Sequence, residues 1–320
     1  MAESLELLIV IINYKTADLI IDCINSVTPQ LEKKQHIVVV DNFSNDGSAE
    51  KIADWVAENG GDRIHMVFSD VNGGFSAGNN LGLKYADADY YLLLNSDALL
   101  RDGALQAMLT TFRDEGSREL GFVAPRLEWP DGKPQESCFR FHSPLSELLN
   151  ASNTGWVTRL LQRWEVAFRV SDTPMTPEWA SFACIMLRGE MVKDVGLMDE
   201  GYFLYYEDAD YCKMAKLNNW HVLYQPEARV VHLRGGSSPV KSNTRLKKRL
   251  PKYYYASRAR FFAKHYGIVG LGLANMLWYV GRCISKSREL LGRQYVTACE
   301  KQYRDIWTRF SMPLKPFRPE

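Results

Sequence analysis

Closely spaced cysteines and net charge are both lacking in this chain of 320 residues. Its six cysteines are scattered, and no two of them form a C-x-x-C pair. This distribution excludes a zinc knuckle, provides no disulfide framework and favours a reducing cytosol as the compartment. The formal net charge is only +1. Because so small a charge creates no polyelectrolyte field, nucleic acid is not an expected partner.

Long apolar runs are also missing. Residues 7–12 are apolar, but the run is too short for the core of a signal peptide, so we expect no such leader. A second apolar run spans residues 268–281. Its 14 residues are few for a membrane-spanning helix, so we do not expect this segment to cross a bilayer.

The common nucleotide-binding fingerprints are absent from the glycine- and asparagine-rich segment 72–82. Gly73 and Gly78 have the spacing of a P-loop, but Asn79 and Asn80 stand where that loop needs lysine and serine or threonine. The segment is not G-x-G-x-x-G either, which excludes the dinucleotide fingerprint. Two interpretations stay open. The segment is either a tight strand–helix turn, or a loop whose backbone N–H groups hold a nucleotide at a helix N-terminus.

The first hundred residues do contain a regular alternation of two hydrophobic periods. Continuous apolar runs predict strands at 7–12, 37–40, 64–68 and 90–94, and helical spacing predicts helices at 17–26, 48–57 and 75–85. This order predicts an α/β fold with a mostly parallel sheet flanked by helices. Ligands bind such sheets at the carboxyl ends of the strands. The polar residues expected at those ends are Asn13, Tyr14, Asp41, Asn42, Asn95 and Asp97.

Two later segments have a different character. Residues 125–178 are rich in proline and predict loops and short helices that form an acceptor pocket, with further strands at 183–187 and 222–224. Residues 241–293 hold thirteen Lys/Arg against one acid, Glu289. A basic, aromatic-rich helix beside a short apolar one fits the interface of an anionic membrane. The alternative is a helical pair packed on the preceding domain, although the charge bias favours the membrane.

Three acidic residues, Glu207, Asp208 and Asp210, lie within four positions after the aromatic-rich residues 201–206. Acidic groups among large apolar side chains are costly to desolvate. This raises the pKa of one of them and suits it to accept a proton as a general base. The alternative is that Asp208 or Asp210 only caps the following helix, and the run taken alone favours that alternative.

A carboxylate at a strand end, Asp97, is a candidate ligand for Mg²⁺ or Mn²⁺. Because it is the one carboxylate in the Asn95-Ser96-Asp97 sequence, the ion would need diphosphate oxygens and waters as further ligands. His232 is a candidate nitrogen ligand, although a lone histidine is more often structural.

Six motifs follow one another along the chain. They are Ile-Asn-Tyr-Lys at 12–15, Val-Asp-Asn-x-Ser-x-Asp-Gly-Ser at 40–48, Asn-x-Gly-Phe-x-x-Gly-x-Asn-x-Gly at 72–82, Leu-Asn-Ser-Asp at 94–97, the segment from Val195 to Asp210, and His232. In this order they resemble the motifs of family 2 glycosyltransferases with the GT-A fold, most of all the rhamnosyltransferase-type enzymes of bacterial polysaccharide and O-antigen assembly. The resemblance covers about residues 5–240.

The resemblance implies a role for each matching position. The residues implied to hold the base and ribose are Asn13, Tyr14, Asp41 and Asn42. Those implied to support the nucleotide and the donor sugar are Asn72, Gly74, Gly78, Asn79 and Asn95. Asp97 takes the last place of the D-x-D metal motif, and Asp208 takes the place of the general base. Glu207 would orient the base or the acceptor, and Asn95 departs from the family because it replaces the first carboxylate of D-x-D.

The resemblance as a whole implies an inverting glycosyltransferase with a divalent metal, Mg²⁺ or Mn²⁺, as cofactor. The expected donor is dTDP-L-rhamnose and the expected acceptor is a lipid-linked saccharide. The protein would then be cytoplasmic and peripheral on the inner face of the bacterial membrane, with a homodimer as a possible assembly. We expect a catalytic domain at 1–240, divided into a nucleotide-sugar half at 1–124 and an acceptor half at 125–240, and a basic helical region at 241–320.

Three alternatives are kept. The enzyme could use another donor, such as a UDP-hexose. A sugar nucleotidyltransferase would usually show a glycine-rich loop with Arg or Lys after the first strand, where Asn-Tyr-Lys-Thr stands at 13–16. A non-catalytic carbohydrate- or membrane-binding homologue would not need Asp97 and Asp208 together.

Overall fold

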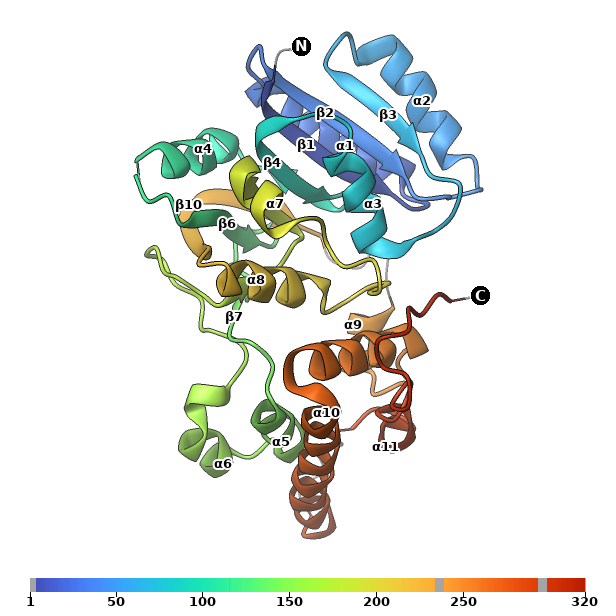
Figure 1. The fold of residues 1–320 in the computed structure, drawn as a ribbon, viewed down its shortest axis with the longest axis vertical. Helices are drawn as coiled ribbons and strands as arrows, with labels where there is room; N and C mark the ends of the chain where they lie inside the picture. The colour runs from blue at the N-terminus through green and yellow to red at the C-terminus, as the bar shows by residue number, and fades with distance from the viewer. Residues whose placement is uncertain (1–3, 115, 234–238, 293–297, 320) are drawn as a thin grey trace.

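A mixed sheet of eight strands forms the centre of the protein, in a computed structural model that describes residues 4–114, 116–233, 239–292 and 298–319 (Figure 1). The strand order is β3-β2-β1-β4-β9-β6-β10-β5. The strands are β1 (Leu5–Asn13), β2 (Gln35–Asp41), β3 (Ile64–Phe68), β4 (Ala88–Asn95), β5 (Ala98–Leu100), β6 (Leu120–Glu128), β9 (Cys184–Arg188) and β10 (His221–His232). A separate pair joins β7 (Cys138–Phe139) to β8 (Trp179–Ala180).

Helices cover both faces of the sheet because the inner strands are apolar on both sides. In β1, Leu7 and Ile9 face one hydrophobic core while Leu8 and Val10 face the other. The helices on the first face are α1 (Ala17–Val27), α2 (Ser48–Asn59) and α4 (Ala104–Asp114). Those on the second face are α3 (Gly74–Leu83), α7 (Gly189–Val195) and α8 (Glu207–Leu217).

The remaining helices gather beyond one end of the sheet (Figure 1). They are α5 (Pro144–Ser152), α6 (Gly155–Leu160), α9 (Val240–Arg245), α10 (Lys252–Leu290) and α11 (Gln302–Asp305), and two 3₁₀ turns lie at Thr28–Gln30 and Gln162–Trp164. Helix α10 is broken at Gly267, whose φ of 69° and ψ of 178° are not helical. Its two halves therefore run in different directions (Figure 1).

The predicted α/β class is confirmed. The strands expected at 7–12, 37–40, 64–68 and 90–94 are β1 to β4, and they pair in parallel in the order β3-β2-β1-β4. The sheet becomes mixed beyond β4, because β9 runs antiparallel to both β4 and β6.

The prediction of loops from residue 125 onward is wrong for the first residues of that segment. Strand β6 continues to Glu128 and passes through Pro125. A proline is tolerated in a strand at an irregularity of the ladder, and the pairing of β6 with β10 shifts register directly after Gln225, the partner of Pro125. Strand β6 also continues across residues 124 and 125, where we expect the two halves of the catalytic domain to meet. The division into two halves stays a prediction.

The basic segment is partly neutralised by carboxylates of the same chain. Among the described residues, at least five of its Lys/Arg form ion pairs with such carboxylates. The pairs are Arg249–Asp305, Arg258–Glu147, Arg260–Asp199, Lys264 with both Asp199 and Asp210, and Arg282–Glu289. Among the described helices, α10 passes the test of length and composition for crossing a membrane, and 33% of its most apolar window is buried inside the protein.

Candidate active site

A pocket of about 560 Å³ opens at the carboxyl ends of β1, β2 and β4. This is the edge where polar residues were expected to meet, because parallel strands end there together. Of the thirteen predicted site residues, nine line the pocket. They are Tyr14, Asn42, Asn72, Gly74, Asn95, Asp97, Glu207, Asp208 and His232.

Asn13 and Asp41 lie behind the pocket wall. Asn13 is fully buried and donates hydrogen bonds to Asp41 Oδ1 (2.7 Å) and to the hydroxyls of Ser44 (3.1 Å) and Ser48 (2.9 Å). These bonds tie the end of β1 to the end of β2 and to the start of α2. Asn13 and Asp41 therefore have a structural task in the protein, and their contact with a base and ribose stays a prediction.

The glycine- and asparagine-rich loop is shaped by close approaches. Gly74 has φ +84°, and a Cβ there would lie 2.2 Å from the carbonyl oxygen of Phe203. Phe75 donates its N–H to the same oxygen at 2.8 Å, and Asn42 Nδ2 donates to the Gly74 carbonyl at 3.1 Å. The loop is thus a tight turn between β3 and α3, bonded to the residue after β2 and to the segment before the acidic run. Its binding of a nucleotide through backbone N–H groups stays a prediction.

Gly78 and Asn79 do not line the pocket. A Cβ at Gly78 would lie 3.1 Å from the side chain of Ile12, so the glycine lets α3 pack closely on β1. The Asn79 side chain is buried and donates to the Phe75 carbonyl at 3.1 Å. Both residues support the loop from within, and their role toward a donor sugar stays a prediction.

Asp97 and His232 face one another inside the pocket. Asp97 Oδ1 lies 3.6 Å from His232 Nε2, and both side chains are buried. Strand β10 brings His232 to this position by pairing it with Ala98, the residue after Asp97. Two atoms that each lie about 2.0–2.2 Å from one ion are at most about 4.4 Å apart, so this oxygen–nitrogen pair fits a divalent cation. No group of three or more His, Cys, Asp and Glu converges among the described residues, which leaves further positions to substrate oxygens and water.

The acidic run lies inside the first turn of α8 and not ahead of the helix. The N-cap is Tyr206, which makes no side-chain cap bond. The alternative that Asp208 or Asp210 only caps the helix is therefore wrong. Burial raises the pKa of Asp208 to about 6, against the lowering effect of hydrogen bonds from the backbone N–H of Ala209 and of the nearby Lys241 charge.

Glu207 is more deeply buried than Asp208, its neighbour in the pocket. Burial, and then the neighbouring charge of Asp208, raises the pKa of Glu207 well above its ordinary value. Its Oε2 atom is buried and has no hydrogen-bond partner among the described residues. Because a buried polar oxygen without a partner is costly, this atom marks the place where a ligand group would be received.

Two consecutive tyrosines ahead of the acidic run have strained backbones. Tyr205 and Tyr206 both have φ 70°, a left-handed conformation that costs about 1–3 kcal/mol for each residue of this size. Such strain persists where the surroundings determine the conformation, and it clusters at functional sites. Here the turn directs the next two residues, Glu207 and Asp208, into the pocket.

Part of the wall was missed by sequence reasoning. Phe182, Lys241 and Tyr253 line the pocket from segments far apart in the chain. Lys241 begins the basic segment and Tyr253 belongs to its aromatic run, but neither feature says which of the many Lys and Tyr residues meets the acidic run. The absence of a side chain at Gly201 also went unnoticed. It makes room for Arg260, since a Cβ at Gly201 would lie 1.9 Å from the guanidinium carbon of Arg260.

Residues 8–137 match the sequence model of Glycosyl transferase family 2. This part of the chain is therefore similar to a family 2 glycosyltransferase domain. The hexosyltransferase Agl10 of low-salt glycan biosynthesis from Haloferax volcanii is 24% identical over 222 residues, which are 68% of this chain and 64% of the relative. The N-acetylglucosaminyl-diphospho-decaprenol L-rhamnosyltransferase of Mycobacterium tuberculosis is 25% identical over 225 residues, which are 65% of this chain and 69% of the relative. The match thus spans just under two thirds of the length of the first of these relatives.

Solved structures confirm the predicted GT-A fold. GalNAc-T7 with UDP, GalNAc and Mn²⁺ superposes with a TM-score of 0.58 at 13% identity, over 99% of this chain and 56% of that one. The mannosyltransferase PcManGT from Pyrobaculum calidifontis with GDP-Man and Mn²⁺ gives a TM-score of 0.54 at 14% identity, over 98% of this chain and 86% of that one. At such identities the likeness concerns the fold.

Proposed function

We propose that the protein is an inverting glycosyltransferase that moves a sugar from a nucleotide-diphosphate sugar to a hydroxyl of an acceptor. The observation that carries the proposal is one pocket that joins two kinds of groups. Asp97 and His232 offer ligands for a cation, and Asp208 offers a carboxylate whose pKa is raised to about 6. Transfer from a diphosphate needs both, because charge builds on the leaving group while the acceptor loses a proton.

In the proposed reaction Asp208 takes the proton of the acceptor hydroxyl. The acceptor oxygen forms a bond to the anomeric carbon, the bond from that carbon to the diphosphate oxygen breaks, and its electron pair stays on the diphosphate. Displacement in line inverts the anomeric carbon. A carboxylate with a pKa of about 6 is ionised at neutral pH and is still basic enough to accept the proton as the bond forms. Glu207 would orient Asp208 or the acceptor.

Mg²⁺ or Mn²⁺ is the proposed cofactor, held by Asp97 and His232. When bound, such an ion supplies positive charge to the departing diphosphate. GalNAc-T7 and the Pyrobaculum mannosyltransferase, which share the fold, were both solved with Mn²⁺, and this supports the assignment. Asn95 and Ser96 line the pocket beside Asp97 and add neutral polar groups near the diphosphate.

The donor and acceptor are proposed by analogy with the relatives. The mycobacterial relative is named as an L-rhamnosyltransferase acting on a decaprenol-linked sugar, which favours dTDP-L-rhamnose as donor and a lipid-linked saccharide as acceptor. The Haloferax relative is named as a hexosyltransferase, so a UDP-hexose is the second candidate donor. We place catalysis in residues 1–240.

A lipid-linked acceptor would keep the protein at a membrane. We propose that the basic helical region at 241–320 rests on the inner face of the bacterial cytoplasmic membrane from the cytoplasm. The second half of α10 supports this placement, because it exposes an apolar face. The side chains of that face are Ile268, Val269, Leu273, Met276 and Val280, each 50% exposed or more.

A donor panel tests the proposed activity. The purified protein is offered dTDP-L-rhamnose, UDP-hexoses and GDP-mannose with a lipid-linked acceptor, with and without EDTA, and released nucleotide diphosphate is measured. We expect release from one donor, dependent on the acceptor and abolished by EDTA. Full activity in EDTA would contradict the metal role. Binding of a donor without turnover would favour a non-catalytic homologue, and pyrophosphate release from a nucleoside triphosphate and a sugar phosphate would favour a nucleotidyltransferase.

A further inference from the structure

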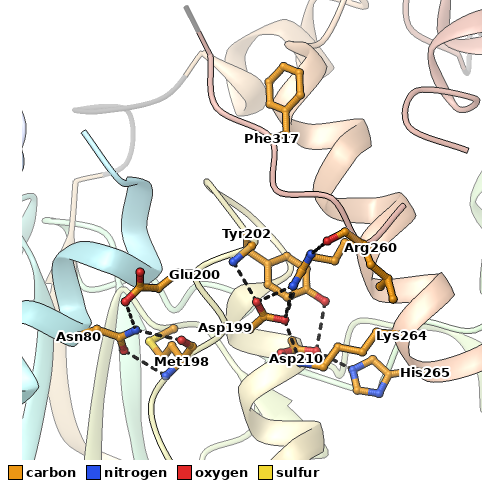
Figure 2. Close-up of polar contacts among 12 residues, drawn as sticks. Asn80, Met198, Asp199, Glu200, Tyr202, Asp210, Arg260, Lys264, His265 and Phe317 are labelled. Carbon is orange, nitrogen blue, oxygen red and sulfur yellow. Dashed lines mark hydrogen bonds and ion pairs between the residues drawn. The ribbon is translucent and has the colours of Figure 1, made fainter. Parts of the chain in front are cut away.

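The segment that carries the acidic run is tied at both ends to the first half of α10. At its start, Asp199 accepts hydrogen bonds from Arg260 at 2.8 Å on Oδ1 and at 3.0 Å on Oδ2. At its end, Asp210 accepts hydrogen bonds from Lys264 at 2.7 Å on Oδ2 and lies 2.7 Å from His265 Nε2 through Oδ1. Figure 2 shows these side chains converging from α10 and from the segment.

Lys264 joins the two ends directly. Its Nζ lies 3.0 Å from Asp199 Oδ2 and 2.7 Å from Asp210 Oδ2, so one ammonium group bridges the carboxylates at the two ends of the segment (Figure 2). The Asp210 side chain is 2% exposed and that of His265 is 4% exposed. A charge buried this deeply needs its partners, because water cannot replace them.

The strained turn lies between these two anchors. Tyr205 and Tyr206, both with φ 70°, are packed by the same face of α10. Tyr254 contacts the rings of both tyrosines, at centroid distances of 5.7 and 5.8 Å, and Phe261 contacts Tyr206 at 5.5 Å. Ser257 donates a hydrogen bond to the Leu204 carbonyl at 3.0 Å. Helix α10 therefore contacts the middle of the 199–210 segment as well as its two ends.

We propose that Arg260, Lys264 and His265 are positioning residues, which hold the 199–210 segment in its strained conformation so that Asp208 faces the pocket. None of the three lines the pocket itself. They act through Asp199 and Asp210, which lie on either side of the turn. The proposal rests on the proposed function in one respect, the role of Asp208 as the base.

The consequence for catalysis is specific. Relaxation of the turn would move Asp208 relative to the acceptor hydroxyl but would leave the nucleotide side of the pocket, built by the ends of β1, β2 and β4, in place. Loss of positioning therefore lowers kcat more than donor affinity, because an error of about 1 Å in a reacting group can cost about 100-fold.

The test replaces Lys264 by methionine and measures two things. Lys193→Met, which removes an exposed lysine from α7, is the control. Hydrogen–deuterium exchange of peptides covering 199–210 reports the segment directly, and we expect faster exchange in Lys264→Met than in the wild type or the control. We also expect kcat for each folded molecule to fall by about 10- to 100-fold, with the Kd of the donor changed by less than about threefold.

The outcomes separate this proposal from the proposed function. Unchanged exchange at 199–210 would overturn the positioning role whether or not the protein is an active transferase. Faster exchange with an unchanged kcat would also overturn it. A wild-type protein inactive with every donor would count against the proposed function, and exchange would still decide whether Lys264 holds the segment. If Lys264→Met does not fold, Lys264→Gln, which retains a hydrogen-bond donor, takes its place with the same readouts.

Discussion

The carboxylate of Asp97 and the imidazole of His232 lie 3.6 Å apart inside the pocket, although 134 positions separate them in the chain. The contact arises because β5 and β10 pair antiparallel at Ala98 and His232. A carboxylate oxygen and an imidazole nitrogen at this distance form a pair suited to Mn²⁺ or Mg²⁺.

The first prediction concerns this pair. His232→Gln should weaken Mn²⁺ binding at least about 10-fold, and Asp97→Asn should weaken it further because it also removes a charge. Electron paramagnetic resonance of free Mn²⁺, titrated with protein and UDP, measures the affinity without turnover. The control is His221→Gln, a partly exposed histidine at the start of the same strand. Equal Mn²⁺ affinity in all four proteins would rule out the pair as a metal site.

The second prediction concerns the pH dependence set by Asp208. Its protonated form cannot accept a proton, so kcat should fall as the pH drops through about 6, the pKa to which burial raises this carboxyl. Asp208→Asn should cut turnover by about 10²–10⁴-fold and remove this acidic limb. Asp89→Asn, an exposed site at the start of β4, serves as control. An acidic limb centred near pH 4 would argue for a base other than Asp208.

The third prediction concerns the close approach at Gly74. Gly47 and Gly74 both have φ +84°, but a Cβ at Gly47 meets nothing within 4 Å while a Cβ at Gly74 meets the Phe203 carbonyl at 2.2 Å. Gly47→Ala should therefore cost only the backbone strain, about 1 kcal/mol of the free energy of unfolding. Gly74→Ala should cost about 1–3 kcal/mol more and weaken donor binding. Urea unfolding and donor titration measure both effects, and equal losses in the two variants would refute the contact.

The fourth prediction concerns a buried ion pair between α5 and α10. The side chains of Arg258 and Glu147 are 3% and 9% exposed, and Arg258 donates to Glu147 Oε2 at 2.9 and 3.1 Å. Arg258→Met leaves a buried carboxylate unpaired, which should lower the free energy of unfolding by about 3–5 kcal/mol.

The exposed pair Lys51–Asp18 provides the comparison. Its side chains are 54% and 84% exposed, so Lys51→Met should cost no more than about 1 kcal/mol. Adding Glu147→Leu to Arg258→Met should recover part of the lost stability, because the second change removes the uncompensated charge. A single Arg258→Met variant as stable as Lys51→Met would show that the buried pair is not needed.

The fifth prediction concerns the apolar face of α10. Val269 and Leu273 are 80% and 50% exposed, and the double variant Val269→Asp/Leu273→Asp should reduce co-sedimentation with anionic vesicles. Phe68→Asp, at a 60% exposed site on β3, should leave it unchanged. Because at least five of the described basic residues are paired within the chain, binding should fall only partly when salt is raised. Undiminished binding of the double variant would mean that another surface meets the lipid.

Much of the site was accessible from local pattern. The apolar runs ending at Asn13, Asp41 and Asn95 predict strands whose carboxyl ends meet, since parallel strands share one edge for their ends. The aromatic residues that precede Asp208 predict a raised pKa for its carboxyl, since large apolar neighbours exclude water from a carboxylate. The pattern does not distinguish a polar residue that lines the pocket, such as Asn42, from one that braces the wall, such as Asn13, because both lie at the end of an apolar strand.

By itself the sequence determined the α/β class, the parallel order of the first four strands and the position of the acidic run, because each depends on hydrophobic period and neighbouring residues. The tertiary structure alone decided which charges meet. The excess of Lys and Arg at 241–293 suggests that this segment binds an anionic partner surface. Arg260 and Lys264 nevertheless form ion pairs within the chain, with Asp199 and Asp210. Partners more than fifty positions apart are brought together by the path of the folded backbone, and no local period records that path.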